Sequence, residues 1–315
     1  MRTVNIGSMQ VPAVAVGCRR FNNLTVSAAD ELVRAAIDMG ATYFDHADLY
    51  GGSLSEQVFG DVLRADPSLR GKMFVQTKCG IRKAMNAFDL SKDYILSAVE
   101  GSLKRLGTDY LDVLLIHRMD ALAEPEEIAE AFGILQQQGK VRAFGVSNVN
   151  PMQIELLKKY LHQDFVVNQM QLSLAHCPMI AQGIYTNMGN DGAIVRDGSI
   201  LDYCRLHDIR IQTWSPLQFG NSAGIFIDHP DFPELNKALS EVAETYSVSK
   251  TTIAFAWLLR HPAKLMPISG SLRVNRLADC VKAVDIRLTR DEWYKLFEAA
   301  GNKLPCNPQP GQATT

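Results

Sequence analysis

The sequence alternates short apolar segments with longer amphipathic ones eight times, and this alternation limits the fold more than any other feature. The apolar segments have the length of β-strands and lie at residues 13–17, 41–47, 73–79, 110–117, 141–148, 165–173, 209–217 and 265–270. A segment with helical periodicity follows each of them. Eight such units predict an α/β protein built as a single (β/α)8 barrel, or TIM barrel. A doubly wound open sheet is the alternative.

Two further segments lie outside this alternation. Residues 3–17 predict an N-terminal β-hairpin with a Gly-Ser turn that leads into the first strand. Residues 288–301 predict an extra C-terminal helix on the outside of the barrel. Because no linker divides the chain, we expect residues 1–315 to form one domain, in which residues 302–315 are a loose tail.

Local signals indicate where the connecting segments begin and end. Ser27 is in position to cap the first helix, and Ser91 to cap the third, which ends at Gly107. Residues 175–198 join the sixth strand to its helix and are rich in Gly and polar residues. A connection of this length predicts either a lid over a site or a passive insertion.

Charge and composition exclude several classes of partner. The formal net charge is −2 and the basic residues form no run, which disfavours nucleic acid and anionic membrane surfaces. No apolar run reaches the roughly 18 residues that a membrane helix needs, and residues 1–12 lack the apolar core of a signal peptide. We therefore expect a cytoplasmic protein with a small-molecule partner. The sequence does not indicate an oligomeric state.

The six cysteines are widely scattered and form no C-x-x-C pair. This spacing supplies no chelating pair, so we expect no metal site and no disulfide framework. Most of these cysteines are expected to be small reduced packing residues.

Polar residues lie where the predicted strands end, and the carboxyl ends of barrel strands are where TIM-barrel sites form. They come from the second to the eighth strand and comprise Asp45, Tyr50, Lys78, His117, Ser147, Asn148, Gln169, Trp214, Ser215 and Ser269. Each has an ordinary alternative role in packing, in capping or on the rim, and their joint placement is what favours a site.

Four of these residues predict a proton-transfer group. A tyrosine hydroxyl has a pKa near 10, so Tyr50 needs a stabilised phenolate to act as an acid at neutral pH. A neighbouring Lys78 ammonium is expected to lower that pKa, and Asp45 to keep the ammonium charged and oriented. His117 can donate a hydrogen bond to a substrate oxygen or help to set the proton transfer. His46 is expected to be structural, as is Asp48.

Lys78 also has an alternative role, as the Schiff-base lysine of a barrel aldolase. Such a lysine must lose its proton, whereas a close carboxylate from Asp45 keeps it charged. The carboxylate therefore disfavours an aldolase.

The chain resembles the aldo-keto reductase family over nearly its whole length. The motifs that carry the resemblance are "FDHADLYGG", "VQTKCG", "LDVLLIHR", "GKVRAFGVSN", "NQMQLSL", "WSPL" and "PISGSLRVNRL", in this order. The tryptophan of "WSPL" is similar to the microbial oxidoreductase and potassium-channel β-subunit branches more than to the mammalian one.

The resemblance implies an NADPH-dependent oxidoreductase that reduces aldehydes or ketones to alcohols. It makes Tyr50 the general acid, with Lys78 and Asp45 tuning it and His117 orienting the carbonyl. The nicotinamide carboxamide is then held by Ser147, Asn148 and Gln169, with Trp214 stacked on the ring and Leu217 over the pyrophosphate. The full set of implied cofactor positions is Asp45, Ser147, Asn148, Gln169, Trp214, Ser215, Leu217, Gly270, Ser271, Arg273, Arg276 and Asp279.

The last strand and helix bear on the choice between NADPH and NADH. Arg273 and Arg276, with Ser271 and the amides that open the helix, can hold a 2′-phosphate, or they can be solvated surface charges. The sequence departs from the family ending "R-x-x-E-N", because Arg276 is followed by "LADC". Asp279 can replace the acidic residue, but Cys280 cannot replace the asparagine. NADPH is favoured and NADH remains possible.

The substrate is less well indicated. Arg19 and Arg20 follow the first strand, where they can favour an anionic or polar carbonyl substrate or form a surface salt bridge. The resemblance to channel β-subunits also allows an alternative function, a cofactor-binding regulatory or sensor protein with little turnover.

Overall fold

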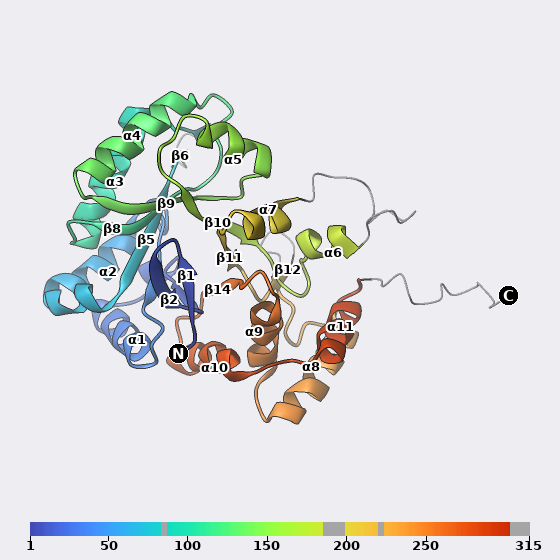
Figure 1. Cartoon of the computed structure of the whole chain (residues 1–315). Helices are drawn as coiled ribbons and strands as arrows, with labels where there is room; N and C mark the ends of the chain where they lie inside the picture. The colour runs from blue at the N-terminus through green and yellow to red at the C-terminus, as the bar shows by residue number, and fades with distance from the viewer. Residues whose placement is uncertain (83–86, 185–198, 220–223, 303–315) are drawn as a thin grey trace.

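Eight parallel strands close into a barrel in the order β3-β4-β5-β8-β9-β10-β11-β14, with β10 paired to β9 and β14 paired to β3 (Figure 1). The computed structural model describes residues 1–82, 87–184, 199–219 and 224–302. The barrel strands are β3 Ala15–Gly17, β4 Tyr43–Asp45, β5 Phe74–Cys79, β8 Leu111–Ile116, β9 Val141–Ser147, β10 Phe165–Gln171, β11 Arg210–Trp214 and β14 Met266–Ser269. The predicted TIM barrel is confirmed and the open sheet is wrong.

Helices surround the barrel in Figure 1. They are α1 Val26–Asp38, α2 Leu54–Ala65, α3 Lys92–Leu106, α4 Pro125–Gln137, α5 Pro151–Lys158, α6 Pro178–Ile184, α7 Ile200–Leu206, α8 Pro233–Tyr246, α9 Lys250–Arg260, α10 Val274–Lys282 and α11 Arg290–Ala299. Short 3-10 helices lie at η1 Phe21–Asn23, η2 Pro67–Lys72 and η5 Ala283–Asp285. Among the described residues, no helix is long and apolar enough to cross a membrane.

The predicted helix caps were partly right. The Ser91 hydroxyl accepts a hydrogen bond from the Tyr94 amide, and Gly107 ends α3 with a φ of 65°. The cap of α1 is Thr25 and not Ser27, because Thr25 has the extended backbone of a capping residue and its hydroxyl accepts from the Ala28 amide. Both hydroxyls precede the same apolar pattern, so the pattern alone could not choose between them.

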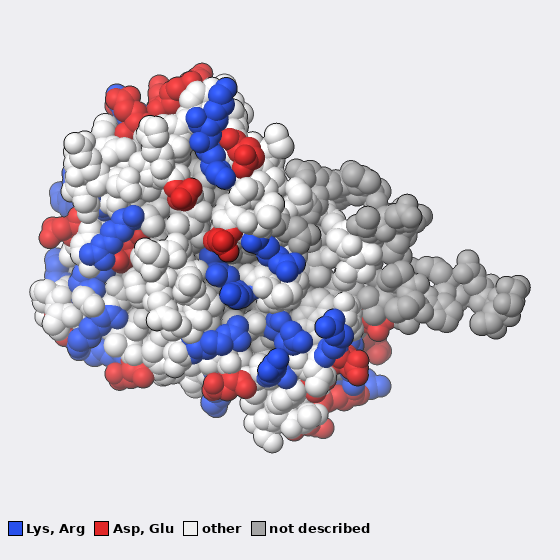
Figure 2. All heavy atoms as spheres, in the orientation of Figure 1, with Lys and Arg blue, Asp and Glu red and all other residues white. Residues whose placement is uncertain are grey.

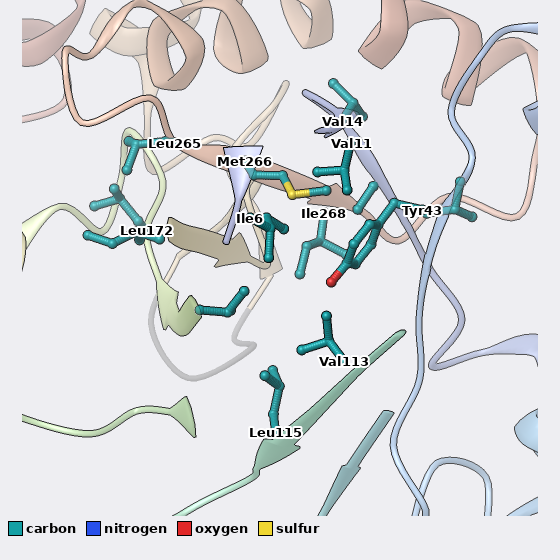
Figure 3. Close-up of a cluster of buried hydrophobic side chains, with 14 of the residues drawn as sticks. Ile6, Val11, Val14, Tyr43, Val113, Leu115, Leu172, Leu265, Met266 and Ile268 are labelled. Carbon is teal, nitrogen blue, oxygen red and sulfur yellow. The ribbon is translucent and has the colours of Figure 1, made fainter. Parts of the chain in front are cut away.

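The predicted N-terminal hairpin is present, and it closes one end of the barrel. Strands β1 (Thr3–Ile6) and β2 (Met9–Pro12) pair antiparallel, and Ile6 and Val11 are fully buried. Figure 3 shows both side chains among residues of the barrel interior. Arg210, the first residue of β11, donates to the Asn5 carbonyl at 3.0 Å. The hairpin therefore lies at the amino ends of the strands, opposite the end where chemistry is expected.

The extra C-terminal helix α11 packs against α9 through two tryptophans. The rings of Trp257 and Trp293 stack with centroids 4.7 Å apart, and each indole N–H donates to the other residue's carbonyl at 3.0 Å. These reciprocal bonds satisfy both buried donors and confirm the predicted helix. Residues 303–315 of the predicted tail lie outside the described residues, and the one-domain organisation stays a prediction.

Two short hairpins at strand ends were not predicted. Strand β6 (Ile81–Arg82) pairs with β7 (Ala87–Phe88) after β5, and β12 (Gln218–Phe219) pairs with β13 (Gly224–Ile225) after β11. Of the predicted lid segment, residues 185–198 lie outside the described residues.

The surface charges are mixed in sign, and the described cysteines are reduced, as the sequence predicts. Acidic and basic side chains are interspersed over the described part of the face in Figure 2. The described cysteines are all buried and free of disulfides; they are Cys18, Cys79, Cys177, Cys204 and Cys280. Cys306 lies outside the described residues.

Candidate active site

A buried ion pair lies at the carboxyl end of β4 and β5. The Lys78 ammonium donates to both carboxylate oxygens of Asp45, at 2.7 and 2.9 Å, and to the His46 carbonyl at 2.7 Å. The Lys78 side chain has no exposed surface. A charge buried this deeply is tolerated only with close, well-directed partners, and these three bonds supply them.

Tyr50 lies on the loop after β4, next to this pair. Lys78 Nζ lies 3.2 Å from the Tyr50 hydroxyl oxygen and donates to it. The hydroxyl hydrogen of Tyr50 has no acceptor among the described residues, so it is available to a ligand. His117, which follows β8, packs edge-on against the Tyr50 ring with centroids 6.0 Å apart. The structure therefore brings together the four residues predicted to move a proton.

The pKa of Tyr50 differs from the expectation. Burial raises this pKa, and Lys78 lowers it by less, so that the net pKa lies above its ordinary value of 10. Burial lowers the pKa of the Lys78 ammonium, but Asp45 and Tyr50 more than offset this and the net pKa is raised. The resting site therefore holds a protonated phenol beside a charged ammonium. The depth of burial, which the sequence does not reveal, is the reason for the correction.

His117 is a neutral imidazole. Burial, with the nearby charges of Lys78, Arg118 and Arg19, lowers its pKa to about 3. Its Nδ1 is buried and has no hydrogen-bond partner in the described part of the chain. A neutral imidazole carries one N–H and one acceptor nitrogen, so His117 can donate one hydrogen bond to a ligand at neutral pH.

The side chains of the two other polar residues in the "FDHADLYGG" segment make no hydrogen bond to this group among the described residues. His46 is fully buried with its ring 4.5 Å from that of Phe59, and burial lowers its pKa to about 3. Asp48 is also buried; burial and the nearby Glu56 raise its pKa to about 7. These positions agree with the structural roles predicted for both.

Three strands at the opposite side of the barrel bring the predicted nicotinamide-binding residues into one chain of hydrogen bonds. The Ser147 hydroxyl donates to the Gln169 carbonyl at 2.9 Å, and the Asn148 amide donates to the Ser147 hydroxyl at 2.8 Å. The Trp214 indole N–H donates to Asn148 Oδ1 at 3.2 Å. The Gln169 side chain reaches across to Asp45, with Nε2 3.0 Å from Oδ1.

Sequence reasoning missed two glutamines that complete this contact. Gln76 Nε2 lies 2.5 Å from Asp45 Oδ1, and both Gln76 and Gln169 donate to Gln212 Oε1. Gln76 and Gln212 are fully buried. The sequence did contain a signal for them. Gln76 lies two positions before Lys78 in β5, and Gln212 lies two positions before Trp214 in β11. Residues two apart in a strand share a face, so both glutamines point into the barrel.

The end of β14 and the start of α10 hold the residues predicted to bind a 2′-phosphate. Arg273 and Arg276 are exposed, and neither side chain has a hydrogen bond or ion pair with the described residues. Ser271 bonds the Arg273 amide at 3.2 Å, which shapes the turn into the helix. Asp279 lies 3.9 Å from Lys282 instead of contacting either arginine.

The remaining predicted positions, Ser215, Leu217, Gly270 and Arg20, lie at the ends of β11, β14 and β3. The Ser215 hydroxyl donates to Gln218 Oε1 at 2.7 Å, and Leu217 is partly buried beside it. Arg20 donates to the Gly270 carbonyl and so ties the loop after β3 to the end of β14.

Two exposed arginines flank the proton-transfer group. Arg19 has no side-chain partner among the described residues, and it contributes, after burial, to lowering the pKa of His117. Arg118, which sequence reasoning missed, acts on His117 in the same way.

The residues present fit a pyridine dinucleotide. No described residue donates to Gln169 Oε1, and the atom is not among the described buried atoms that lack a partner, so it is open to a ligand N–H. Arg273 and Arg276 are cations without partners among the described residues, and they lie at a helix start, where an anion is favoured.

Comparisons with known proteins agree with this geometry. Residues 5–300 match the model of the aldo/keto reductase family. The chain is 37% identical to the uncharacterized oxidoreductase YcsN of Bacillus subtilis, over 94% of this chain and 97% of that protein. It is 34% identical to the 6-dehydroglucose reductase of Novosphingobium aromaticivorans, over 96% of this chain and 97% of that protein. A solved aldo-keto reductase from Klebsiella pneumoniae in complex with NADPH has a TM-score of 0.76 and 25% identity, covering 97% of this chain and 96% of that one. The chain belongs to the aldo/keto reductase family.

Proposed function

We propose that this protein is an NADPH-dependent reductase of aldehydes or ketones in which Tyr50 donates the proton to the carbonyl oxygen. The observation that carries the proposal is the bonding of the Tyr50 hydroxyl: its oxygen accepts from Lys78, and its hydrogen has no acceptor among the described residues. Two 6-dehydroglucose reductases among the relatives, and the NADPH complex of the Klebsiella neighbour, support the reaction class.

The proposed roles of the four residues follow from their charges. When bound, the reduced nicotinamide supplies a hydride to the carbonyl carbon. Because the pKa of Tyr50 is raised at rest, the phenol keeps its proton until negative charge develops on the carbonyl oxygen. Lys78 then stabilises the phenolate that forms, and Asp45 keeps Lys78 charged. Neutral His117 orients the carbonyl oxygen through its N–H.

The proposed cofactor contacts use polar atoms that the protein leaves free. Gln169 Oε1 accepts from the nicotinamide carboxamide, and the bonded chain of Ser147, Asn148 and Trp214 supports the same end. Arg273 and Arg276 hold the 2′-phosphate, which favours NADPH over NADH. Ser215, Leu217, Gly270, Ser271 and Asp279 complete the set as proposed binding positions.

We also propose that the substrate carries an anionic or strongly polar group. Arg19 supports this, because it is an exposed cation without a partner among the described residues, near both Tyr50 and His117. Arg20 is bound to the Gly270 carbonyl. We therefore assign the substrate contact first to Arg19.

Fluorescence titration with NADPH and NADH, followed by a panel of carbonyl compounds monitored by NADPH consumption, tests the proposal. We expect tighter binding of NADPH and turnover of part of the panel. Tyr50→Phe should lower kcat/KM by about 10²–10⁴-fold, the contribution of a general acid. The matched control is Tyr160→Phe, because Tyr160 follows α5 in the outer layer of the barrel. Full activity in Tyr50→Phe contradicts the proton-donor role, and tight NADPH binding without any turnover indicates the sensor function instead.

A further inference from the structure

Four buried side chains form a continuous polar layer across the barrel interior, which we call the amide layer. Its members are Asp45 on β4, Gln76 on β5, Gln169 on β10 and Gln212 on β11. Asp45 lies beside Gln76 in the strand register, and Gln169 lies beside Gln212. None of the four is more than 3% exposed. Gln76 and Gln212 were not among the predicted site residues.

Asp45 favours one orientation of two amides in this layer. An ionised carboxylate only accepts hydrogen bonds, whereas a glutamine amide has two N–H donors and one oxygen acceptor. Gln76 and Gln169 both turn Nε2 to Asp45 Oδ1, at 2.5 and 3.0 Å. Turning either amide around would place its oxygen against the carboxylate oxygen, and the repulsion between two acceptors opposes this.

Gln212 fixes the second N–H of each amide. Its Oε1 accepts from Gln76 Nε2 at 2.8 Å and from Gln169 Nε2 at 2.9 Å. If Gln212 were turned around, its own N–H groups would face these two donors and both bonds would be lost. Its Nε2 instead faces Met266 Sδ at 3.7 Å.

The far end of the layer is closed by Tyr43. Figure 3 shows the Tyr43 hydroxyl pointing into the apolar cluster that contains Val113 and Ile268. The hydroxyl donates to Gln76 Oε1 at 2.7 Å, so the only acceptor of Gln76 is occupied. Every amide in the layer therefore has one permitted orientation.

The single acceptor that the layer leaves open is Gln169 Oε1. Both N–H groups of Gln169 point inward, to Asp45 and Gln212, and no described residue donates to its oxygen. The atom is not among the described buried atoms without a partner. A ligand at this place meets an acceptor and no donor from Gln169.

We propose that Gln76 and Gln212 are positioning residues that lock Gln169 as a pure acceptor, and that they thereby make the cofactor site specific for a nicotinamide ring with a carboxamide N–H. This inference rests on the proposed function, since it concerns the same dinucleotide. Neither glutamine contacts the ligand; each acts through the orientation of Gln169.

The test compares NADP⁺ with its 3-acetylpyridine analogue, in which a methyl group replaces the carboxamide nitrogen. Both ligands carry a carbonyl oxygen, but only NADP⁺ carries the N–H that a locked Gln169 can accept. The wild type should bind NADP⁺ about five- to tenfold more tightly, as expected for one net hydrogen bond. Binding is measured by quenching of tryptophan fluorescence, without turnover.

Gln212→Met should reduce this preference to about twofold or less, because the second N–H of Gln169 loses its acceptor and the amide can turn to donate to either carbonyl oxygen. Gln76→Met removes the other partner of Gln212, so it should also reduce the preference for NADP⁺. It replaces Gln212→Met in the test if that variant does not fold. Gln212→Glu keeps an acceptor at the same atom and should retain the wild-type preference. Thermal unfolding of each variant checks that it is folded.

A third ligand separates a local effect from a general one. 2′-Phospho-ADP-ribose lacks the nicotinamide, so every folded variant should bind it with wild-type affinity. A wild type that binds NADP⁺ and the analogue equally, or folded Met variants that keep the full preference, overturn the inference. If either of these outcomes is found and the wild type still reduces carbonyl compounds, the proposed function stands. A wild type that binds no NADP⁺ and reduces no carbonyl compound overturns the proposed function itself.

Discussion

An ion pair lies against each face of strand β5, and the pairs differ in which polar atoms around them are left without a hydrogen bond. On the inner face Lys78 pairs with Asp45 and bonds Tyr50. On the outer face Thr77 donates to Glu56 at 2.6 Å, and Glu56 pairs with Arg105 of α3 at 2.8 Å. Thr77 and Lys78 are adjacent in β5 and point to opposite faces, so one strand contacts both the inner and the outer ion pair.

The outer pair is saturated, whereas the inner pair leaves polar atoms free toward the carboxyl end of the barrel. Both oxygens of Glu56 accept hydrogen bonds, and Arg105 also bonds the Ser102 hydroxyl at 3.1 Å. Around the inner pair, the Tyr50 hydroxyl hydrogen and Gln169 Oε1 have no partner among the described residues. We therefore expect the outer pair to support the fold and the inner pair to serve the proposed site.

Lys78→Met should produce the largest effect, because it breaks the pair that serves both purposes. Loss of the ammonium removes the stabilisation of the Tyr50 phenolate, and we expect kcat/KM to fall by about 10²–10⁴-fold. It also leaves the Asp45 carboxylate buried without a cation, at a cost of about 3–5 kcal/mol in the free energy of unfolding. Steady-state kinetics and urea unfolding measure the two losses. Lys72→Met, at an exposed site, is the control, and retained activity in Lys78→Met would remove the basis of the comparison.

Glu56→Gln should destabilise the protein and spare the chemistry. The amide nitrogen of the new side chain faces a donor, and Arg105 loses its counter-charge. Because Arg105 is 26% exposed, we expect a loss near the lower end of the range for a broken buried pair, about 3 kcal/mol. Urea unfolding measures the loss, and kcat/KM per folded molecule should be retained. If activity falls as far as in Lys78→Met, the two faces do not have separate roles.

Asp48 lies near the outer pair, yet its Oδ1 is buried and has no partner among the described residues. Burial and Glu56 raise its pKa from 3.8 to about 7, so the folded state holds a proton that the unfolded state releases near pH 4. Stability should therefore fall as pH rises from about 4 to about 7 and stay level above that. Glu56, Arg105, Lys78, Cys79 and Tyr94 are the titratable groups that interact with it.

Asp48→Asn should remove this pH-dependent loss. The pKa difference sets an upper bound of about 4 kcal/mol, and with relaxation around the group we expect a gain of about 2 kcal/mol over the wild type at pH 8. Urea unfolding at pH 5 and pH 8 tests it, since the gain should shrink at the lower pH. An equal difference between the two proteins at both pH values contradicts the assignment.

Arg276→Ala should have the smallest effect. Its guanidinium has no partner among the described residues, so its loss should leave the free energy of unfolding unchanged and weaken NADPH binding by about tenfold, or about 1.4 kcal/mol, with little effect on NADH. Arg70→Ala is the matched control, because Arg70 is bonded to Thr108, Tyr110 and Asp112. That variant should lose stability and keep the NADPH preference. Titration of both variants with both cofactors distinguishes the two outcomes.

The fold and the proton-transfer group could be predicted because their signals are local. Each strand is a short apolar run, and Asp45, Lys78 and His117 each stand where such a run ends. The barrel then brings these ends together without further information.

The rest depends on distances that the sequence does not contain. Gln76 and Gln212 are 136 residues apart and meet only across the closed barrel. The direction of the Tyr50 pKa depends on how deeply the loop is buried. Arg20 is held by Gly270, a contact made when the last strand pairs with the first.

The hairpin at the amino end of the barrel has a consequence for the order of folding during synthesis. Asn5 is bonded to Arg210, which is made 205 residues later. At about 5–20 residues per second, the hairpin waits roughly 10 to 40 seconds on the ribosome before that partner is translated. Through this interval Ile6 and Val11 lack the finished barrel in which they are buried. The hairpin is thus translated long before it can reach its final contacts.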